Sequence, residues 1–142
     1  MARRLRAIGK PMSAVVDSCG WLEYIANGSN ASFFESALQN EAQLLVPQIV
    51  VFEVCKRLLI LQQDHAVDSV LQVMERCKVA DLNTRQMLLA AQAAQKYKLA
   101  MADAIIWQTA QVHKAALYTQ DADLKALPGV QYKAKIPTVP QL

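Results

Sequence analysis

Short apolar runs alternate along the chain with longer segments whose apolar residues recur at the spacing of one helix face. The short runs predict strands near residues 14–17, 43–46, 79–82, 116–119 and 131–135. The periodic segments predict helices over residues 20–26, 31–38, 64–77, 84–97 and 102–114, and one more that begins at Pro47. Strands that alternate with helices are typical of a parallel sheet. The pattern therefore predicts an α/β domain with a mostly parallel central sheet of about five strands, flanked by helices on both faces.

The residues between these elements predict where the helices begin and end. Ser18 is expected to cap the first helix, and the Asn27–Gly28 pair to end it. Pro47 fits the first position of a helix, where its missing N–H costs nothing. A short helix is expected to begin near Asp121 and to stop at Pro128.

The length and composition fit one compact domain. The chain has 142 residues, 54% of them hydrophobic, with 4 Gly and 5 Pro, which suits a buried core and not a linker. We expect a basic arm over 1–12, the domain over 13–136 and a tail over 137–142. Because no apolar run reaches the roughly 18 residues that span a bilayer, and no secretion signal precedes the domain, we expect a cytoplasmic protein without membrane contact. The 3 cysteines lack CxxC spacing, which argues against a zinc site or a disulfide framework.

Four acidic residues lie within or directly after apolar runs, namely Asp17, Glu53, Asp103 and Asp121. The net charge of +3 does not by itself indicate nucleic acid. If these four acids converge, the 15 basic residues exceed the remaining acidic residues by 7, which favours attraction of a polyanion. Asp17 and Asp121 each follow a predicted strand, where parallel sheets place their functional crevice.

Convergence of four carboxylates would imply a hard divalent cation, and Mg²⁺ or Mn²⁺ suits oxygen ligands. At a phosphodiester such an ion activates water, so hydrolysis needs no protein nucleophile. A second interpretation stays open, in which Asp17 and Asp121 cap helices and Glu53 faces solvent.

Four motifs, in this order, resemble those of the PIN-domain family, especially the VapC-type toxins of bacterial toxin–antitoxin pairs. VVDSCGWLEY is similar to the first motif, FEVCKRL to the glutamate motif, MADAIIWQTA to the motif of the third acid and TQDADL to the last. The resemblance extends from Ala14 to about Val130. The basic segment before it is longer than the family's usual start.

The resemblance implies a metal-dependent endoribonuclease. It implies that the catalytic residues and ligands of Mg²⁺ or Mn²⁺ are Asp17, Glu53, Asp103 and Asp121. Ser18 and Thr119 become supporting hydroxyl groups beside these acids. It further implies an RNA substrate, an inhibiting antitoxin protein as a partner, and a homodimer.

Two further acids have two interpretations each. Asp123 either approaches a second metal ion or is a solvent-exposed capping residue, and Glu23 either lies at the rim of the cleft or is a solvated helix residue.

Three alternative functions are weighed against the nuclease. The first is a PIN-like RNA- or protein-binding module without catalysis, against which the intact set of acids argues. The second is a phosphoacceptor receiver module, which needs an acidic pair near the first strand, where this chain has only Asp17. The third is a deoxyribonuclease of related architecture, which usually carries more acids and extra helices.

Overall fold

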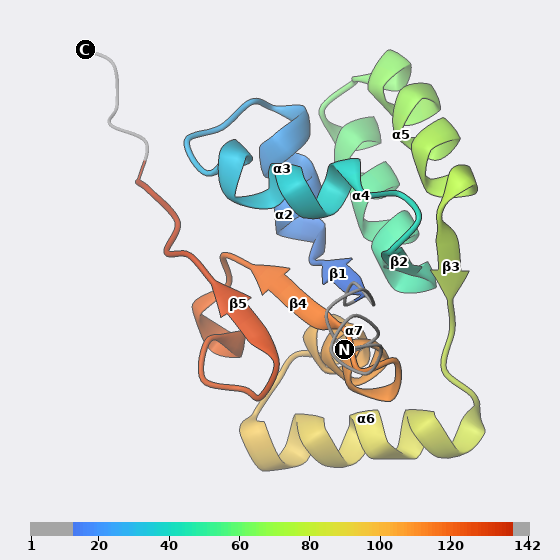
Figure 1. Ribbon diagram of the computed structural model, residues 1–142, viewed down its shortest axis with the longest axis vertical. Helices are drawn as coiled ribbons and strands as arrows, with labels where there is room; N and C mark the ends of the chain where they lie inside the picture. The colour runs from blue at the N-terminus through green and yellow to red at the C-terminus, as the bar shows by residue number, and fades with distance from the viewer. Residues whose placement is uncertain (1–12, 138–142) are drawn as a thin grey trace, which may run out of the picture.

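The computed structural model describes residues 13–137 and contains one parallel sheet of five strands. The strands are β1 (Ala14–Val16), β2 (Leu44–Pro47), β3 (Lys78–Ala80), β4 (Ala116–Thr119) and β5 (Val130–Tyr132). Their order across the sheet is β3-β2-β1-β4-β5, so β1 lies in the centre (Figure 1). After β1, the strands β2 and β3 are added on one side of it, and β4 and β5 are added on its other side. The direction in which strands are added therefore reverses between β1 and β4. The predicted parallel α/β sheet is confirmed.

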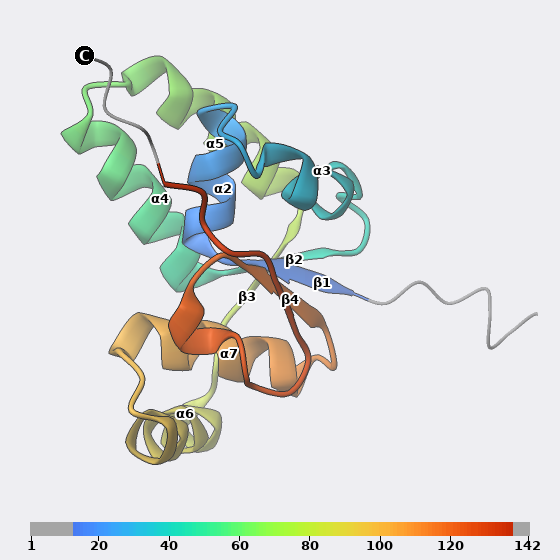
Figure 2. The ribbon, with the colours of Figure 1, turned by 90° about the vertical axis from the view of Figure 1, so that its left-hand side faces the viewer.

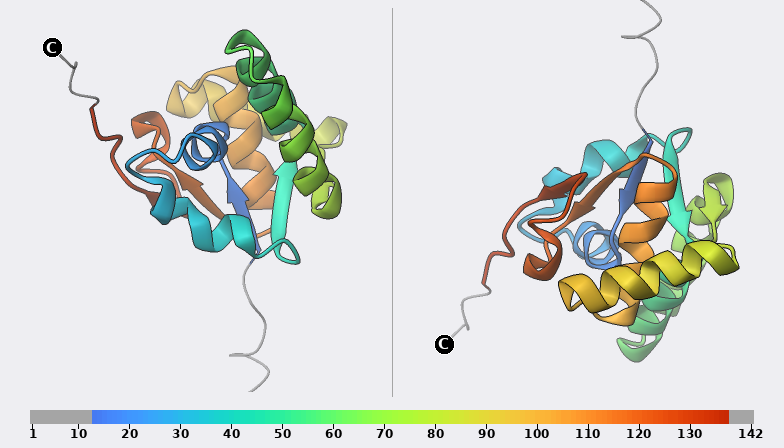
Figure 3. Two further views of the ribbon diagram at one scale, coloured as in Figure 1. Left: turned by 90° about the horizontal axis from the view of Figure 1, so that it is seen from above. Right: turned by 90° about the horizontal axis from the view of Figure 1, so that it is seen from below.

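Helices cover both faces of this sheet. They are α2 (Ser18–Ile25), α3 (Ala31–Gln39), α4 (Gln48–Ile60), α5 (Asp64–Arg76), α6 (Thr84–Tyr97) and α7 (Met101–Val112), with a 3₁₀ turn η1 (Ala122–Leu124). α2, α3, α4 and α5 lie on one side, and α6 and α7 on the other (Figure 2). α6 runs across the outer side of α7 (Figure 3). The six longer predicted helices are confirmed to within a few residues at their ends, whereas the short helix predicted from Asp121 to Pro128 is only the 3₁₀ turn η1.

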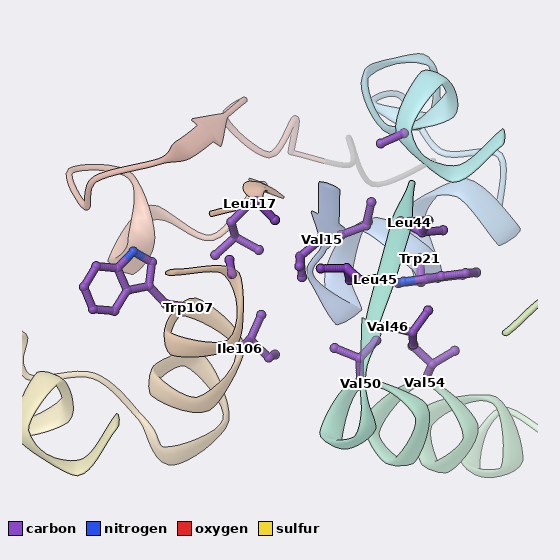
Figure 4. Packing of buried hydrophobic residues seen from close by; sticks show 14 of the residues in the cluster. Val15, Trp21, Leu44, Leu45, Val46, Val50, Val54, Ile106, Trp107 and Leu117 are labelled. Carbon is purple, nitrogen blue, oxygen red and sulfur yellow. The ribbon is translucent and has the colours of Figure 1, made fainter. Parts of the chain in front are cut away.

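The core explains why the central strands are apolar along their whole length. Val15 and Val16 of β1 are fully buried because helices cover both faces of the strand. Val46, Val50 and Ile106 meet them from β2, α4 and α7 in the same cluster (Figure 4). Large apolar side chains thus fix β1 between the two helical layers. Asp17, which directly follows β1, is therefore held in place as well.

Two helix ends differ from prediction by one residue. Asp17, not Ser18, caps α2, as the second interpretation of this acid expected, and the N–H of Ser18 donates to Asp17 Oδ1 at 2.7 Å. Both residue types are good caps, and the extended backbone of Asp17 at the end of β1 decides between them. Pro47 is the last residue of β2 and the cap of α4, not its first helical residue, because its pairing with Ala80 extends the strand.

Two strands, β3 and β5, are also placed differently from the predicted 79–82 and 131–135. β3 covers 78–80, and Asp81 leaves the sheet by accepting the N–H of Leu82. β5 covers 130–132, not 131–135; beyond it Asn30 Nδ2 donates to the carbonyl of Ala134 at 3.0 Å, so a side chain holds this segment instead of a sheet ladder. The predicted basic arm lies outside the described residues, as does nearly all of the predicted tail. Within residues 13–137, none of the helices combines the length and apolar character needed to cross a membrane.

Candidate metal centre

Three of the four predicted acids meet at the carboxyl ends of β1 and β4. Asp17 follows β1 directly, Asp121 lies two residues beyond β4, and Asp103 is in the first turn of α7. One carboxylate oxygen from each lies within 4.8 Å of the other two. β1 and β4 are neighbours at the point where strand order reverses, which is where parallel sheets form ligand sites.

The carboxylate of Asp17 is held at both oxygens. Its side chain is 4% exposed, and Oδ1 accepts the N–H of Ser18 as part of the α2 cap. Oδ2 accepts a hydrogen bond from Thr119 Oγ1 at 2.8 Å. Oδ2 also accepts the thiol of Cys19, whereas Oδ1 has the N–H of Ser18 as its one donor in the described residues, so Oδ1 keeps a lone pair for a cation.

Thr119 connects the first acid with the last. Its fully buried hydroxyl donates to Asp17 and accepts the backbone N–H of Asp121 at 2.9 Å. Asp121 Oδ1 in turn accepts the N–H of Asp123 at 2.9 Å, which begins η1. A single hydroxyl therefore links the side chain of Asp17 to the backbone of Asp121, in addition to the backbone pairing of β1 with β4.

Glu53 lies beside this trio and not within it. It is half-buried on α4, and its Oε1 accepts a hydrogen bond from Ser18 Oγ at 2.5 Å. Ser18 thus contacts two acids, Asp17 through its N–H and Glu53 through its hydroxyl. Glu53 also belongs to the set of carboxylates whose charge acts on Asp103.

The electrostatics of the trio are unfavourable without a cation. Burial raises the pKa of Asp17 above its ordinary value, although hydrogen bonds from Thr119 and Cys19 oppose the rise. Burial, followed by the charges of Asp121 and Asp17, raises the pKa of Asp103 to about 7. In residues 13–137 the single side-chain ion pair joins Arg76 to Glu41, so no lysine or arginine neutralises the trio.

These observations fit a hard divalent cation. Asp17, Asp103 and Asp121 offer carboxylate oxygens at a common point, and such oxygens are the ligands that Mg²⁺ and Mn²⁺ prefer. Burial is the main cause of the raised pKa of Asp103, and a cation at this point would offset both the burial of its charge and the repulsion from Asp121 and Asp17. Glu53 accepts a hydrogen bond from Ser18 with one oxygen and lies next to the three carboxylates without belonging to their group.

Cys19 is a site residue that the sequence analysis missed. Its Sγ donates to Asp17 Oδ2 at 3.4 Å and lies 3.7 Å from Thr119 Oγ1. Burial, then the charge of Asp17, raises the pKa of this thiol to about 12, so it stays a neutral donor. The available signal was its position two residues after Asp17, in the first turn of the capped helix, where side chains approach the cap.

The two additional candidate acids lie outside the trio. Asp123 is exposed, and it contributes its backbone N–H, not its carboxylate, to Asp121. Glu23 is half-buried in α2, and its side chain lies against Gly28 beyond the end of that helix.

The fold and the motifs match known proteins. The model of the PIN domain family matches residues 14–130. No match was found among curated proteins. A chain of a toxin–antitoxin complex from Klebsiella pneumoniae superposes with a TM-score of 0.71 at 22% identity, over 84% of this chain and 96% of that chain. A chain of VapBC2 from Rickettsia felis, bound to a promoter DNA fragment, superposes with a TM-score of 0.66 at 15% identity, over 87% of this chain and 98% of that chain. A chain of DNA-bound VapBC from Salmonella typhimurium superposes with a TM-score of 0.63 at 16% identity, over 87% of this chain and 98% of that chain.

The structural likeness supports the fold, and the family match covers every strand from β1 into the start of β5 together with all four motif acids. Three of the four motif acids, Asp17, Asp103 and Asp121, meet at the point of the parallel sheet where strand order reverses. This chain therefore belongs to the PIN domain family.

Proposed function

We propose that the protein is a metal-dependent endoribonuclease and the toxin of a toxin–antitoxin pair. The convergence of Asp17, Asp103 and Asp121 within 4.8 Å, without a neutralising side chain in the described residues, is the observation that carries the proposal. The toxin role is supported by the solved relatives, which are chains of toxin–antitoxin and VapBC complexes. Its setting is the cytoplasm, where RNA is the abundant polyanion.

In this proposal Asp17, Asp103 and Asp121 hold Mg²⁺ or Mn²⁺. When bound, such an ion lowers the pKa of an attacking water and neutralises charge on the scissile phosphate. Asp17 is fixed for this role by Thr119 and by the cap of α2. Protein side chains thus supply preformed ligand positions, and no serine, cysteine or histidine is required as a nucleophile.

Glu53 has a separate role in the same reaction. Because Ser18 donates to Oε1, the second carboxylate oxygen is the one left to accept a proton from, or orient, a water molecule. Ser18 is then a positioning residue for Glu53, and Thr119 is one for Asp17. Asp123 and Glu23 are proposed to act at most at the rim of the site, since neither joins the trio.

The partners are an RNA substrate, an antitoxin and a second copy of the chain. RNA is favoured because the basic residues of the chain outnumber the acidic ones outside the motif set. The antitoxin is inferred from the complexes in which the relatives were solved. Native pull-down should recover a protein that abolishes cleavage when it is added back to the purified chain.

The deciding experiment incubates purified chain, freed of any bound protein, with total cellular RNA in the presence of Mg²⁺, of Mn²⁺ or of a chelator. New 5′ ends are mapped by sequencing. We expect discrete cuts with either metal and none with chelator. Asp103→Asn should abolish them, while Asp68→Asn, which changes an exposed acid of α5 in the same way, should not.

The same experiment tests the alternative of a PIN-like binding module without catalysis. If folded wild type binds metal and RNA and makes no cut, the nuclease proposal is wrong and the binding module is correct. Cuts that persist in Asp103→Asn would point to a contaminating nuclease.

A further inference from the structure

Asn30 stands at the start of α3 but does not cap it. Asparagine is among the best N-cap residues, because its side-chain oxygen accepts the N–H groups of the first helical turn. Here the side chain forms no such bond, although Asn30 holds the N-cap position. The residue is fully buried, where an idle polar group is costly. Its amide group therefore serves contacts with other parts of the chain.

The NH₂ group of Asn30 donates to two distant segments. Nδ2 donates to Gln120 Oε1 at 3.1 Å and to the carbonyl oxygen of Ala134 at 3.0 Å. Because a backbone carbonyl only accepts hydrogen bonds, the amide has to turn its NH₂ group, and not its oxygen, toward this point. The chain after β5 thus passes the turn between α2 and α3 (Figure 1) and is joined there to the motif that follows β4.

Gln120 brings this contact to the candidate metal centre. It is buried and lies between Thr119, which donates to Asp17, and Asp121, one of the three acids. Successive side chains of an extended segment alternate in direction. Thr119 and Asp121 are therefore directed toward the acidic trio, and Gln120 is directed away from it, toward Asn30. The residue that precedes Asp121 is held from the side opposite to the trio.

The segment 133–137 has few other fixed contacts. The N–H of Lys133 donates to the carbonyl of Thr119 at 3.1 Å, which continues the pairing of β4 with β5. Among the residues that the structure describes, the bond from Asn30 to Ala134 is the only hydrogen bond of residues 134–137, which are all exposed. Asn30 is therefore the main anchor of this segment.

We propose that Asn30 is a positioning residue that couples the segment 133–137 to the proposed metal ligand Asp121 through Gln120. With both acceptors in place, Asn30 holds the turn that carries Asp121 where its carboxylate meets those of Asp17 and Asp103. When the segment leaves Asn30, water gains access to the amide and competes for its bond to Gln120. Coupling between two sites is reciprocal, so a cation bound at Asp121 also stabilises the seated segment.

This coupling rests on the proposed function, since Asp121 is a metal ligand only under that proposal. It adds a part of the chain outside the four motifs to the determinants of metal affinity. The experiments below measure Mn²⁺ binding and proteolysis and do not measure RNA cleavage, so the two proposals fail on different results.

Calorimetric titration of Mn²⁺ into the purified full chain tests the effect of Asn30 on the metal centre. Gln120→Met removes the acceptor at nearly constant side-chain length and leaves the bond to Ala134 in place. We expect the Mn²⁺ dissociation constant to rise about tenfold, as for other groups that orient metal ligands. Asn30→Ala should weaken binding at least as much. Adding Gln120→Met to Asn30→Ala should weaken it no further, because both changes break the same bond.

Gln111→Met is the matched control. Gln111 Nε2 donates to the carbonyl of Pro128 at 2.9 Å, so this glutamine also fastens a loop to the fold, at a place without contact to the three acids. The variant should bind Mn²⁺ as tightly as wild type. Circular dichroism confirms that each variant is folded before titration.

Trypsin tests the reverse effect, because Lys133 and Lys135 are exposed cleavage points within the segment. Saturating Mn²⁺ should slow cuts after these two lysines several-fold in wild type and in Gln111→Met, with the products identified by mass spectrometry. In Gln120→Met, saturating Mn²⁺ should slow them much less, because the connection to Asp121 is lost.

Two results would overturn the coupling and leave the nuclease proposal standing. One is a folded Gln120→Met chain that binds Mn²⁺ as tightly as wild type, or a loss of the same size in Gln111→Met. The other is a wild type that binds Mn²⁺ without any protection of Lys133 and Lys135 from trypsin. A wild type that binds no Mn²⁺ would overturn the metal centre and the coupling together.

Discussion

Thr119 Oγ1 donates to Asp17 Oδ2 at 2.8 Å across 102 positions of sequence, and the same oxygen accepts the N–H of Asp121. One hydroxyl therefore connects the two acids that follow the paired strands β1 and β4. This threonine is fully buried, so its hydroxyl bonds are shielded from bulk water.

Thr119→Val keeps the shape of the side chain and removes the hydroxyl. We expect RNA cleavage to fall about 10- to 100-fold, the usual cost of removing a group that orients metal ligands. The free energy of unfolding should fall by about 1–3 kcal/mol, because the N–H of Asp121 loses its partner in a buried place. Cleavage rates over a range of Mn²⁺ concentrations and urea unfolding measure the two effects. Thr119→Ser, which retains the hydroxyl, should keep most of the activity; equal losses in both variants would contradict the role.

The raised pKa of Asp103 predicts how stability depends on pH. Because its pKa is about 7 in the folded chain and 3.8 in the unfolded chain, the folded state binds the proton more tightly. With chelator present, stability should therefore fall as pH rises from about 4 to about 7 and then level off. Asp17, whose pKa burial also raises, acts in the same direction. We expect a loss of about 1–2 kcal/mol from Asp103, since water screens this partly exposed carboxyl.

Thermal unfolding of wild type and Asp103→Asn, with chelator, between about pH 5 and pH 8 measures this dependence. The variant should lose much of it and be the more stable protein at the upper end. Added Mn²⁺ should raise the melting temperature of wild type more at high pH, where protons no longer compete for the carboxylates. A wild type whose stability rises with pH over this interval would contradict the electrostatic account of the site.

The bond between Ser18 and Glu53 predicts coupling between two substitutions. Ser18→Ala leaves Glu53 without its 2.5 Å donor, and Glu53→Gln removes the charge. Each should lower the cleavage rate about tenfold or more. If Ser18 acts through Glu53, the double variant should be no slower than the slower single variant, as in other units that act together. Losses that multiply would mean that the two residues act independently.

Gly20 and Gly28 provide a matched pair for the packing beneath the site. A Cβ at Gly20 would lie 2.6 Å from Val16 Cγ1 and 2.7 Å from the Phe34 ring, both in the core. Gly20→Ala should therefore cost about 1–3 kcal/mol of unfolding free energy. At Gly28 the obstructing atoms belong to the flexible end of Glu23, which can turn toward solvent, so Gly28→Ala should cost well under about 1 kcal/mol. Equal melting temperatures for the two variants would refute this reading of the helix packing.

The order of strands and helices could be predicted because each element buries one or both of its faces, and buried positions appear in the sequence as apolar residues at regular spacing. β1 is apolar throughout since both of its faces are covered, and α6 runs from Thr84 to Tyr97 as predicted. The placement of Asp17 and Asp121 after strands was also predictable from where parallel sheets form sites.

The remaining details depend on contacts between distant segments. Neighbouring residues Asp17 and Ser18 both suit a helix cap, and only the extension of β1 selects the first. Nothing local shows that Ser18 Oγ reaches Glu53, 35 positions away. Cys19 carries no metal-ligand spacing, and its contact with Asp17 and Thr119 exists only because β4 returns to the side of β1.

The order of the strands also has a consequence for synthesis of the protein. β4 adds to the sheet beside β1 only after β2 and β3 have been made, and Asp121 follows β4. Domains fold during translation from their N-terminal part onward. When Asp17, Glu53 and Asp103 have emerged from the ribosome, the nascent chain still lacks Thr119, whose hydroxyl links the ends of β1 and β4. The ribosome that makes this proposed ribonuclease is thus exposed to an incomplete site until nearly the whole fold has emerged.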